Sequence, residues 1–296
     1  AHVRAVLPSH EGLTWLGTAS GLSGVERLWE TTHFTALPDP QSLPTYALIA
    51  SWVDPESGTL WVASEGGGVS RSNDGGFTWE TFTTAEGLGS NSILALWGDD
   101  SGIWAGTDGS GVSHTTDGGA TWQTFTTEQG LGDNVITALW GDGAGTLWVG
   151  TYGGGISLTA DGGATWQTLT PDPALGLDSV FNIRGDEEGA VWVDTGYGNL
   201  AVTSDGGQSW EAVTVSVFST DALDNPLLPR PALWSDARGY MWVGTYGQGL
   251  ARTGDRGKHW EAFTTAEGLG SDAITTLWSD DQGTLDRKSK SLKSSH

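Results

Sequence analysis

The sequence contains no cysteine and few basic residues, and both shortages narrow the chemistry that it can carry out. Without cysteine, thiol catalysis and thiolate metal sites are excluded. Thirteen Lys and Arg stand against 36 Asp and Glu, a formal net charge of −23. Residues 287–296 hold four of the basic residues, so residues 1–286 carry 9 against 36, or −27. A chain this acidic repels nucleic-acid phosphates and anionic membranes, and we expect neither as a partner.

Long hydrophobic stretches are missing as well. No run of about twenty apolar residues occurs and no signal peptide is visible, so the composition predicts a soluble chain, either cytoplasmic or already processed, without membrane insertion. No segment of useful length carries an apolar period of 3.6 residues. Helical repeats are therefore excluded.

The sequence does contain an internal repeat that is marked by tryptophan. A tryptophan in a run resembling LWVGT recurs at steps of 46, 43, 44, 44 and 50 residues, at Trp15, Trp61, Trp104, Trp148, Trp192 and Trp242. Within one copy, four short runs rich in β-branched or aromatic residues are separated by glycine or Asp-Gly turns, at 134–142, 146–152, 155–161 and 165–170. A period of this length with several strands indicates a unit that buries its faces by stacking on its neighbours.

Four antiparallel strands per repeat predict an all-β protein, a β-propeller of four-stranded blades, with a linear solenoid as the rival. We expect blades to start near residues 2, 45, 91, 134, 178, 230 and 272, which makes six complete blades and a partial seventh in a propeller domain of residues 1–285. A seven-bladed ring is favoured over a six-bladed one. The first strand of each blade should line the axis, and Trp148 should be packed between blades.

The end of the chain departs from the repeat. The next tryptophan is due at position 286, where the residue is Asp286, and residues 286–296 form a basic tail that matches no repeat position. We expect the natural repeat to continue and this tail to be a truncation or an unrelated addition; a genuine basic C-terminal arm is the alternative.

In five repeats a second tryptophan follows the first by eighteen residues, at Trp79, Trp122, Trp166, Trp210 and Trp260. The turns that lead to these tryptophans share one motif, which reads SNDGGFTW, TTDGGATW, TADGGATW, TSDGGQSW and TGDRGKHW at 72–79, 115–122, 159–166, 203–210 and 253–260. It resembles the Asp-box, Ser/Thr-x-Asp-x-Gly-x-Thr-Trp, of sialidase-type and other propellers. Aspartate accepts backbone N–H groups inside such a turn, and glycine adopts the conformation that it needs. We therefore predict a structural role for the five aspartates, Asp74, Asp117, Asp161, Asp205 and Asp255. No arginine framework or Arg-Ile-Pro segment typical of sialidases is present.

The other half of the repeat, GLGSNSILALWGDDSGIWAGTDGSGV, is similar to the two-component regulator propeller repeat over residues 45–285. That resemblance implies an extracytoplasmic, periplasmic or secreted, sensor module that binds a ligand, and it implies a signalling domain elsewhere in a full-length parent. No kinase-like or membrane segment follows in this sequence.

One register position offers oxygen ligands at the entry to the first strand of several repeats. Six residues before the first-strand tryptophan position lie Asn91, Asn134, Asp178 and Asp272, with Tyr46 at the same position of an earlier repeat. Two amides and two carboxylates around an axis suit Ca²⁺. The alternative is that these side chains order the turn into the strand.

A second set of candidates lies in the glycine-rich turns between second and third strands. Tyrosine beside carboxylates suits a sugar or small ligand, because the ring covers apolar sugar faces while acids accept hydroxyls. The set is Glu65, Asp108, Tyr152, Tyr197 and Tyr246, with Tyr46 beside them, and ordinary rim residues are the alternative.

The leading function hypothesis is a binding or sensor propeller for a small molecule or carbohydrate. The alternatives are a calcium-dependent hydrolase of esters, lactones or phosphotriesters, with the ion in the channel, and a protein-interaction scaffold.

Overall fold

A computed structural model describes residues 3–8, 13–18, 21–26, 48–169, 175–196, 199–218, 231–245, 247–274, 277–279 and 285–286. The chain divides into two compact units, Ala1–Thr168 and Leu169–His296, and each is described by itself. Of the predicted ligand-binding residues, Tyr46, Tyr197 and Tyr246 lie outside the described residues.

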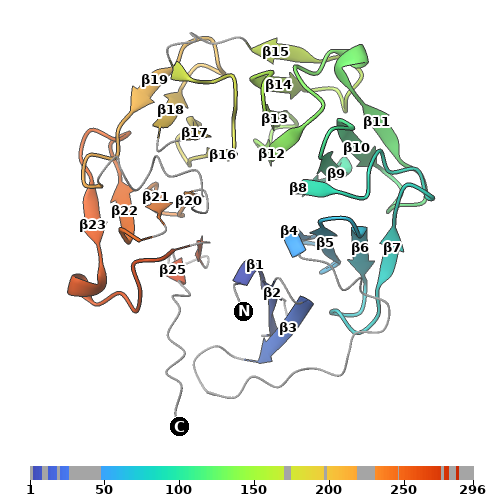
Figure 1. Cartoon of the computed structure of the whole chain (residues 1–296), viewed down its shortest axis with the longest axis horizontal. Coiled ribbons are helices and arrows are strands. Elements are labelled where there is room, and N and C mark those ends of the chain that lie inside the picture. The colour runs from blue at the N-terminus through green and yellow to red at the C-terminus, as the bar shows by residue number, and fades with distance from the viewer. Residues whose placement is uncertain are drawn as a thin grey trace. The chain divides into compact units, whose positions relative to one another are not determined.

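Unit 1 contains a three-stranded sheet followed by four-stranded sheets (Figure 1). The three-stranded sheet is formed by β1 (Val3–Pro8), β2 (Leu13–Thr18) and β3 (Gly21–Glu26). The next sheet comprises β4 (Leu48–Val53), β5 (Leu60–Ser64), β6 (Gly68–Ser72) and β7 (Glu80–Phe82). It is followed by β8 (Ile93–Asp99), β9 (Gly102–Thr107), β10 (Val112–Thr115) and β11 (Gln123–Phe125). The last comprises β12 (Ile136–Gly141), β13 (Leu147–Thr151), β14 (Ile156–Thr159) and β15 (Gln167–Leu169).

Unit 2 repeats the same arrangement. One sheet is built from β16 (Asn182–Gly185), β17 (Val191–Gly196), β18 (Asn199–Thr203) and β19 (Glu211–Val213). The next is built from β20 (Ala232–Ser235), β21 (Met241–Gly244), β22 (Leu250–Thr253) and β23 (Glu261–Phe263). A pair of short strands follows, β24 (Trp278–Ser279) and β25 (Leu285–Asp286).

Every four-stranded sheet is an antiparallel meander whose strands follow chain order. The four strands predicted per repeat are thereby confirmed in these five sheets. The fourth strand is shorter than predicted: it covers Gln167–Leu169 instead of 165–170, because the residues before it belong to the aspartate-containing turn.

The core of unit 1 lies between successive sheets. The first strand β8 packs against the first strands β4 and β12 of the neighbouring sheets. Figure 1 shows the fourth strands β7 and β11 at the opposite edge of their sheets from β4 and β8. Gly106 of β9 is required here, because a Cβ at this position would lie 2.6 Å from Cγ2 of Ile136 in the next sheet. Trp148 is 4% exposed, as the repeat predicts. The second strands β5, β9 and β13 are almost completely buried, so their sheets bury side chains on both faces.

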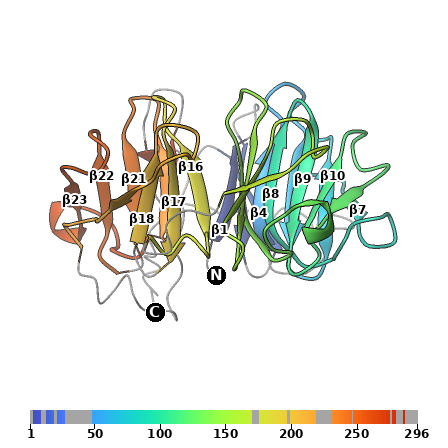
Figure 2. The ribbon, with the colours of Figure 1, turned by 90° about the horizontal axis from the view of Figure 1, so that it is seen from above.

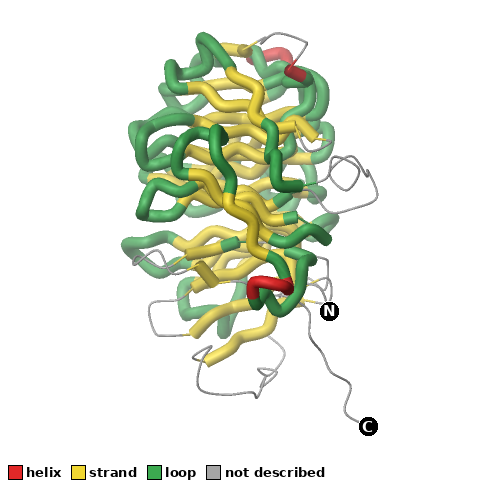
Figure 3. Tube along the Cα trace, turned by 90° about the vertical axis from the view of Figure 1, so that its left-hand side faces the viewer, coloured by secondary structure: helices red, strands yellow, loops and turns green. Residues whose placement is uncertain are grey.

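Helical structure among the described residues includes the short 3-10 turns η1 (Thr127–Gln129) and η3 (Thr265–Glu267), drawn in red in Figure 3. Within the described part of the chain, no helix is long and apolar enough to cross a membrane.

The structure defines five four-stranded sheets. The first sheet shows three strands, and a fourth would fall within residues 27–47, outside the described residues. The ring size, the partial seventh blade and the domain boundary at 285 stay predictions.

Candidate functional site

Each four-stranded sheet has two ends with different turns, and Figure 2 shows the turns gathered at the ends of the strands. At one end lie the turns between first and second strands and between third and fourth strands; we call this the aspartate-turn end. At the other lie the turns between second and third strands and the connection to the next sheet; we call this the connection end. The described members of the predicted metal and ligand sets belong to the connection end.

The aspartate turns form closed local hydrogen-bond networks. In the turn after β10, Oδ1 of Asp117 accepts the N–H of Thr121 at 2.9 Å, and Oδ2 accepts its hydroxyl at 2.6 Å. Thr115 donates its hydroxyl to Asp117 and accepts the N–H of Gly119. The same contacts recur around Asp74, Asp161, Asp205 and Asp255. In the turn of Asp255, His259 stands at the position that Thr121 holds in the turn of Asp117. These carboxylates are occupied within their own turns, which is the structural role predicted for them.

The hydrogen bonds also stabilise the charged form of these carboxylates. The hydroxyl and then the N–H of Thr121 lower the pKa of Asp117 to about 2, and Ser209 lowers the pKa of Asp205 to about 2 in the same way. Since the ordinary pKa of aspartate is about 4, these groups remain ionised throughout the neutral range.

At the connection end, the segment that joins one sheet to the next is a built loop. Thr126 is the N-cap of η1, and the side-chain oxygen of Gln129 accepts the N–H of Thr126, which makes a capping box. Thr83 with Glu86 and Thr264 with Glu267 form the same pair. A leucine in each connection is buried beneath it, at Leu88, Leu131 and Leu269.

Three of the four predicted metal residues fix this connection to the sheets. Oδ1 of Asn134 accepts the N–H of Thr127 at 2.9 Å, while its backbone carbonyl accepts the N–H of Gly111 in the β9–β10 turn at 2.8 Å. Asn91 makes the same contacts with Thr84 and with Gly66 and Gly68, and Asp272 makes them with Thr265 and with Gly247 and Gly249. We call this arrangement the connection clasp. It joins the turn between the second and third strands of one sheet to the residue that leads into the first strand of the next.

Asp178 occupies the same register position but differs in its surroundings. The clasp donor lies seven residues earlier, and for Asp178 that residue is Pro171, which has no N–H. Asp178 is exposed, and the structure gives its side chain no hydrogen bond among the described residues. Its carboxylate therefore has no part in a side-chain clasp.

These contacts bear on the calcium prediction. A calcium ion needs six to eight oxygen ligands, whereas the side-chain oxygens of Asn91, Asn134 and Asp272 already accept hydrogen bonds in the clasp. Asn91 and Asn134 lie in unit 1, and Asp178 and Asp272 lie in unit 2. The described residues also contain no group of three or more His, Asp or Glu side chains placed to hold a metal ion. The donor set fits the clasp better than an ion, and the metal site stays a prediction.

The described members of the predicted ligand set are all exposed. Glu65, Asp108 and Tyr152 occupy the turns between second and third strands in successive sheets of unit 1. Glu65 and Asp108 each form a β-bridge to the next sheet, at Ser92 and Val135. Tyr152 is 60% exposed, unlike most large apolar side chains of the described residues.

Glycine holds the turn of Tyr152 against the adjacent connection. The backbones of Gly132 and Gly154 approach so closely that a Cβ on either residue would lie 2.1 Å from the other's backbone. Asp133, beside this contact, fixes its own loop by accepting the N–H of Val135. Tyr152 is therefore presented on a fixed backbone next to a carboxylate.

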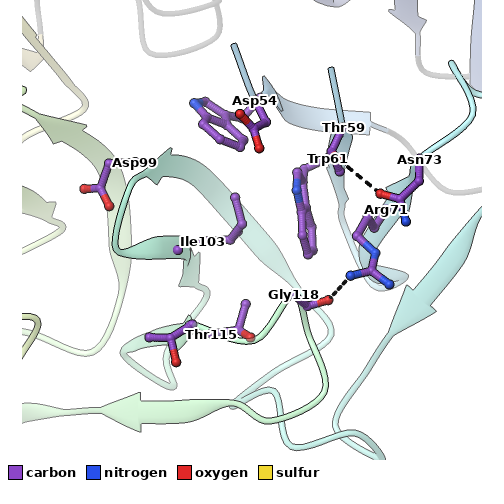
Figure 4. A pocket seen from close by; sticks show the side chains of 12 residues that line it. Asp54, Thr59, Trp61, Arg71, Asn73, Asp99, Ile103, Thr115 and Gly118 are labelled. Atoms are coloured by element: carbon purple, nitrogen blue, oxygen red, sulfur yellow. Dashed lines mark hydrogen bonds between the residues drawn. The ribbon is translucent and has the colours of Figure 1, made fainter. Parts of the chain in front are cut away.

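Sequence reasoning did not find the cavities at the aspartate-turn end. One of about 200 Å³ lies between the β4–β7 and β8–β11 sheets (Figure 4). Arg71 extends across it: its guanidinium donates to the carbonyl of Gly118 in the neighbouring sheet and to Glu80. The same guanidinium lies 5.7 Å from the ring centre of Trp61. The available signal was that the residue paired with the repeat tryptophan changes in chemistry between repeats.

No family model matches the sequence, and no curated protein matches it. Solved structures do resemble it. The extracellular domains of two putative hybrid two-component systems of B. thetaiotaomicron superimpose with TM-scores of 0.74 and 0.75 at 19% identity, over 96% of this chain and 37% and 39% of theirs. A GH74 xyloglucanase from Xanthomonas campestris superimposes with a TM-score of 0.68 at 18% identity, over 95% of this chain and 49% of the enzyme.

These similarities establish the fold as propeller-like, with repeated four-stranded blades. The chain resembles the extracellular domains of two-component sensors, and it spans about two fifths of their length.

The clasp predicts different effects for two residues at one register position. Asn134→Ala removes the acceptor of the Thr127 N–H and should lower the free energy of unfolding by about 1 kcal/mol. Asp178→Ala, which has no clasp donor, should change it by less than about 0.5 kcal/mol. Urea denaturation of both variants measures the difference, and equal losses would show that the side-chain clasp contributes nothing.

The aspartate turns predict a loss of stability in acid. Because the folded-state pKa values of Asp117 and Asp205 lie below that of an unfolded aspartate, their contribution is complete above about pH 4 and is lost as the pH falls towards 2. Denaturation curves at pH 6, 4 and 3 should show this decline, and Asp117→Asn should reduce its slope. A slope identical to wild type would contradict the assignment.

Proposed function

We propose that this chain is a ligand-binding module of the sensor type, which recognises a small polar molecule or carbohydrate at the connection end of unit 1. The observation that carries the proposal is the exposure of Tyr152 on a glycine-fixed turn. An exposed aromatic ring costs hydrophobic free energy that a ligand can recover by covering it. Asp108 and Glu65 at the equivalent turns offer carboxylate acceptors for hydroxyl groups.

The likeness to sensor domains supports the class of function, although at 19% identity it shows the fold alone. We propose an extracytoplasmic location and a longer parent protein with a signalling domain, since the chain spans only part of those domains. Calcium-dependent hydrolysis and a protein-interaction scaffold stay predictions of the sequence.

The proposal is tested by isothermal titration of the purified chain against a panel of mono- and oligosaccharides, with the variant Tyr152→Ala. Loss of the ring should weaken binding by about tenfold, since an aromatic contact contributes roughly 1 kcal/mol beyond its buried area. Tyr152→Phe should retain most of the affinity, because the ring face remains.

Phe77 supplies the matched control. It is 64% exposed and lies in an aspartate turn, at the opposite end of its sheet. Phe77→Ala should leave the affinity unchanged. Equal effects of Tyr152→Ala and Phe77→Ala, or full binding by both variants, would contradict a site at the connection end.

A further inference from the structure

A second cavity at the aspartate-turn end lies one sheet further along the chain. It measures about 460 Å³ and opens between the β8–β11 and β12–β15 sheets. Its walls are the β8–β9 turn (99–101), Trp104, the β12–β13 turn (143–147) and the β14–β15 turn (159–162). It is equivalent in position to the cavity of Figure 4, because Gly162 and Leu147 here correspond to Gly118 and Ile103 there.

The two cavities differ in the residue that stands opposite the repeat tryptophan. In the smaller cavity, Arg71 reaches the carbonyl of Gly118. In the larger one, the equivalent residue is His114, which turns back to the carbonyl of Ser101 at 3.1 Å and stacks on Trp104 at 3.6 Å. Burial lowers the pKa of His114, so it is uncharged at neutral pH. A guanidinium therefore lines the smaller cavity, whereas none lines the larger one among the described residues.

The charge of the larger cavity suits a cation. Asp99, Asp100 and Asp161 line it, and the described residues around it include no lysine or arginine. Asp161 is engaged in its own turn, and Asp99 accepts the N–H and the hydroxyl of Ser101. The side chain of Asp100 is exposed and has no hydrogen bond among the described residues. An ammonium or guanidinium group entering here would find carboxylates without a competing side-chain cation.

A buried donor beside this cavity also lacks an acceptor within the described part of the chain. Trp192 and Trp242 donate their indole N–H to Asp186 and Asp236, each six residues earlier. The β8–β9 turn is one residue shorter, so Asp99 lies five residues before Trp104. Trp104 is 1% exposed, and its indole nitrogen has no hydrogen-bond partner among the residues that the structure describes. By this equivalence its N–H is directed towards the turn that forms one wall of the cavity.

We propose that this cavity binds a small organic cation, a guanidinium or primary ammonium compound that also carries an oxygen acceptor. The cationic group takes the place that the Arg71 side chain holds in the smaller cavity, and the oxygen approaches the side of Trp104. The site lies at the opposite end of the sheets from Tyr152, so it is independent of the function proposed above.

The test is isothermal titration of the full chain with L-arginine and with agmatine, which lacks the carboxylate; glucose and acetate serve as neutral and anionic controls. We expect one site for both cations, tighter for arginine, and weaker binding at high salt. His114→Arg should fill the cavity from within and reduce the affinity by at least about tenfold. Arg71→His should open the smaller cavity and raise the stoichiometry towards two.

Matched substitutions keep the test decisive. Asp100→Asn should weaken binding several-fold, whereas Glu187→Gln, at the same turn position of the β16–β19 sheet, and Tyr152→Ala should not. Thermal denaturation verifies that each variant is folded, and Asp100→Asn decides the matter if His114→Arg does not fold. The proposal is overturned if neither cation binds at concentrations up to about 10 mM, or if folded His114→Arg and Asp100→Asn both bind as wild type does.

Discussion

The connection clasp is the contact on which the arrangement of the sheets depends. Asn134, for example, lies just before the β12–β15 sheet, and its backbone carbonyl accepts the N–H of Gly111 in the β9–β10 turn. The clasp therefore joins two successive sheets at one residue. Gly111 can donate there only because its φ is +78°, and a Cβ on it would lie 1.9 Å from the carbonyl oxygen of Phe125. Apolar packing between the sheets supplies the free energy, and the clasp fixes the register in which they pack.

Much of the fold follows from the sequence, because a repeat presents the same pattern several times. Trp148 and its counterparts predicted the second strand correctly. The third strand, predicted over 155–161, covers Ile156–Thr159, because Asp161 belongs to the turn. The length of the fourth strand was overestimated, since residues such as Thr165 hydrogen-bond to the turn instead of a neighbouring strand. Ring size depends on how distant repeats meet, and no local pattern encodes it.

The candidate sites were less predictable. Asn134 and Asp272 attract attention as oxygen ligands in one register, yet their oxygens accept N–H groups seven residues earlier, a relation visible only in three dimensions. Pro171 was the one sequence sign that Asp178 differs. The two cavities differ because Arg71 pairs with Trp61 on the adjacent strand, whereas His114 pairs with Trp104. These pairs follow from the strand register, which the sequence alone does not show.

Native-state hydrogen exchange of the clasp amides tests this account most directly. Gly66 and Gly247 are exposed turn residues, yet their N–H groups donate to the clasp carbonyls of Asn91 and Asp272. If the clasp joins the sheets, these amides should exchange with free energies within about 1 kcal/mol of those of the central strands β9 and β13. Exchange as fast as in an unstructured surface loop would show that the sheets are held by packing alone.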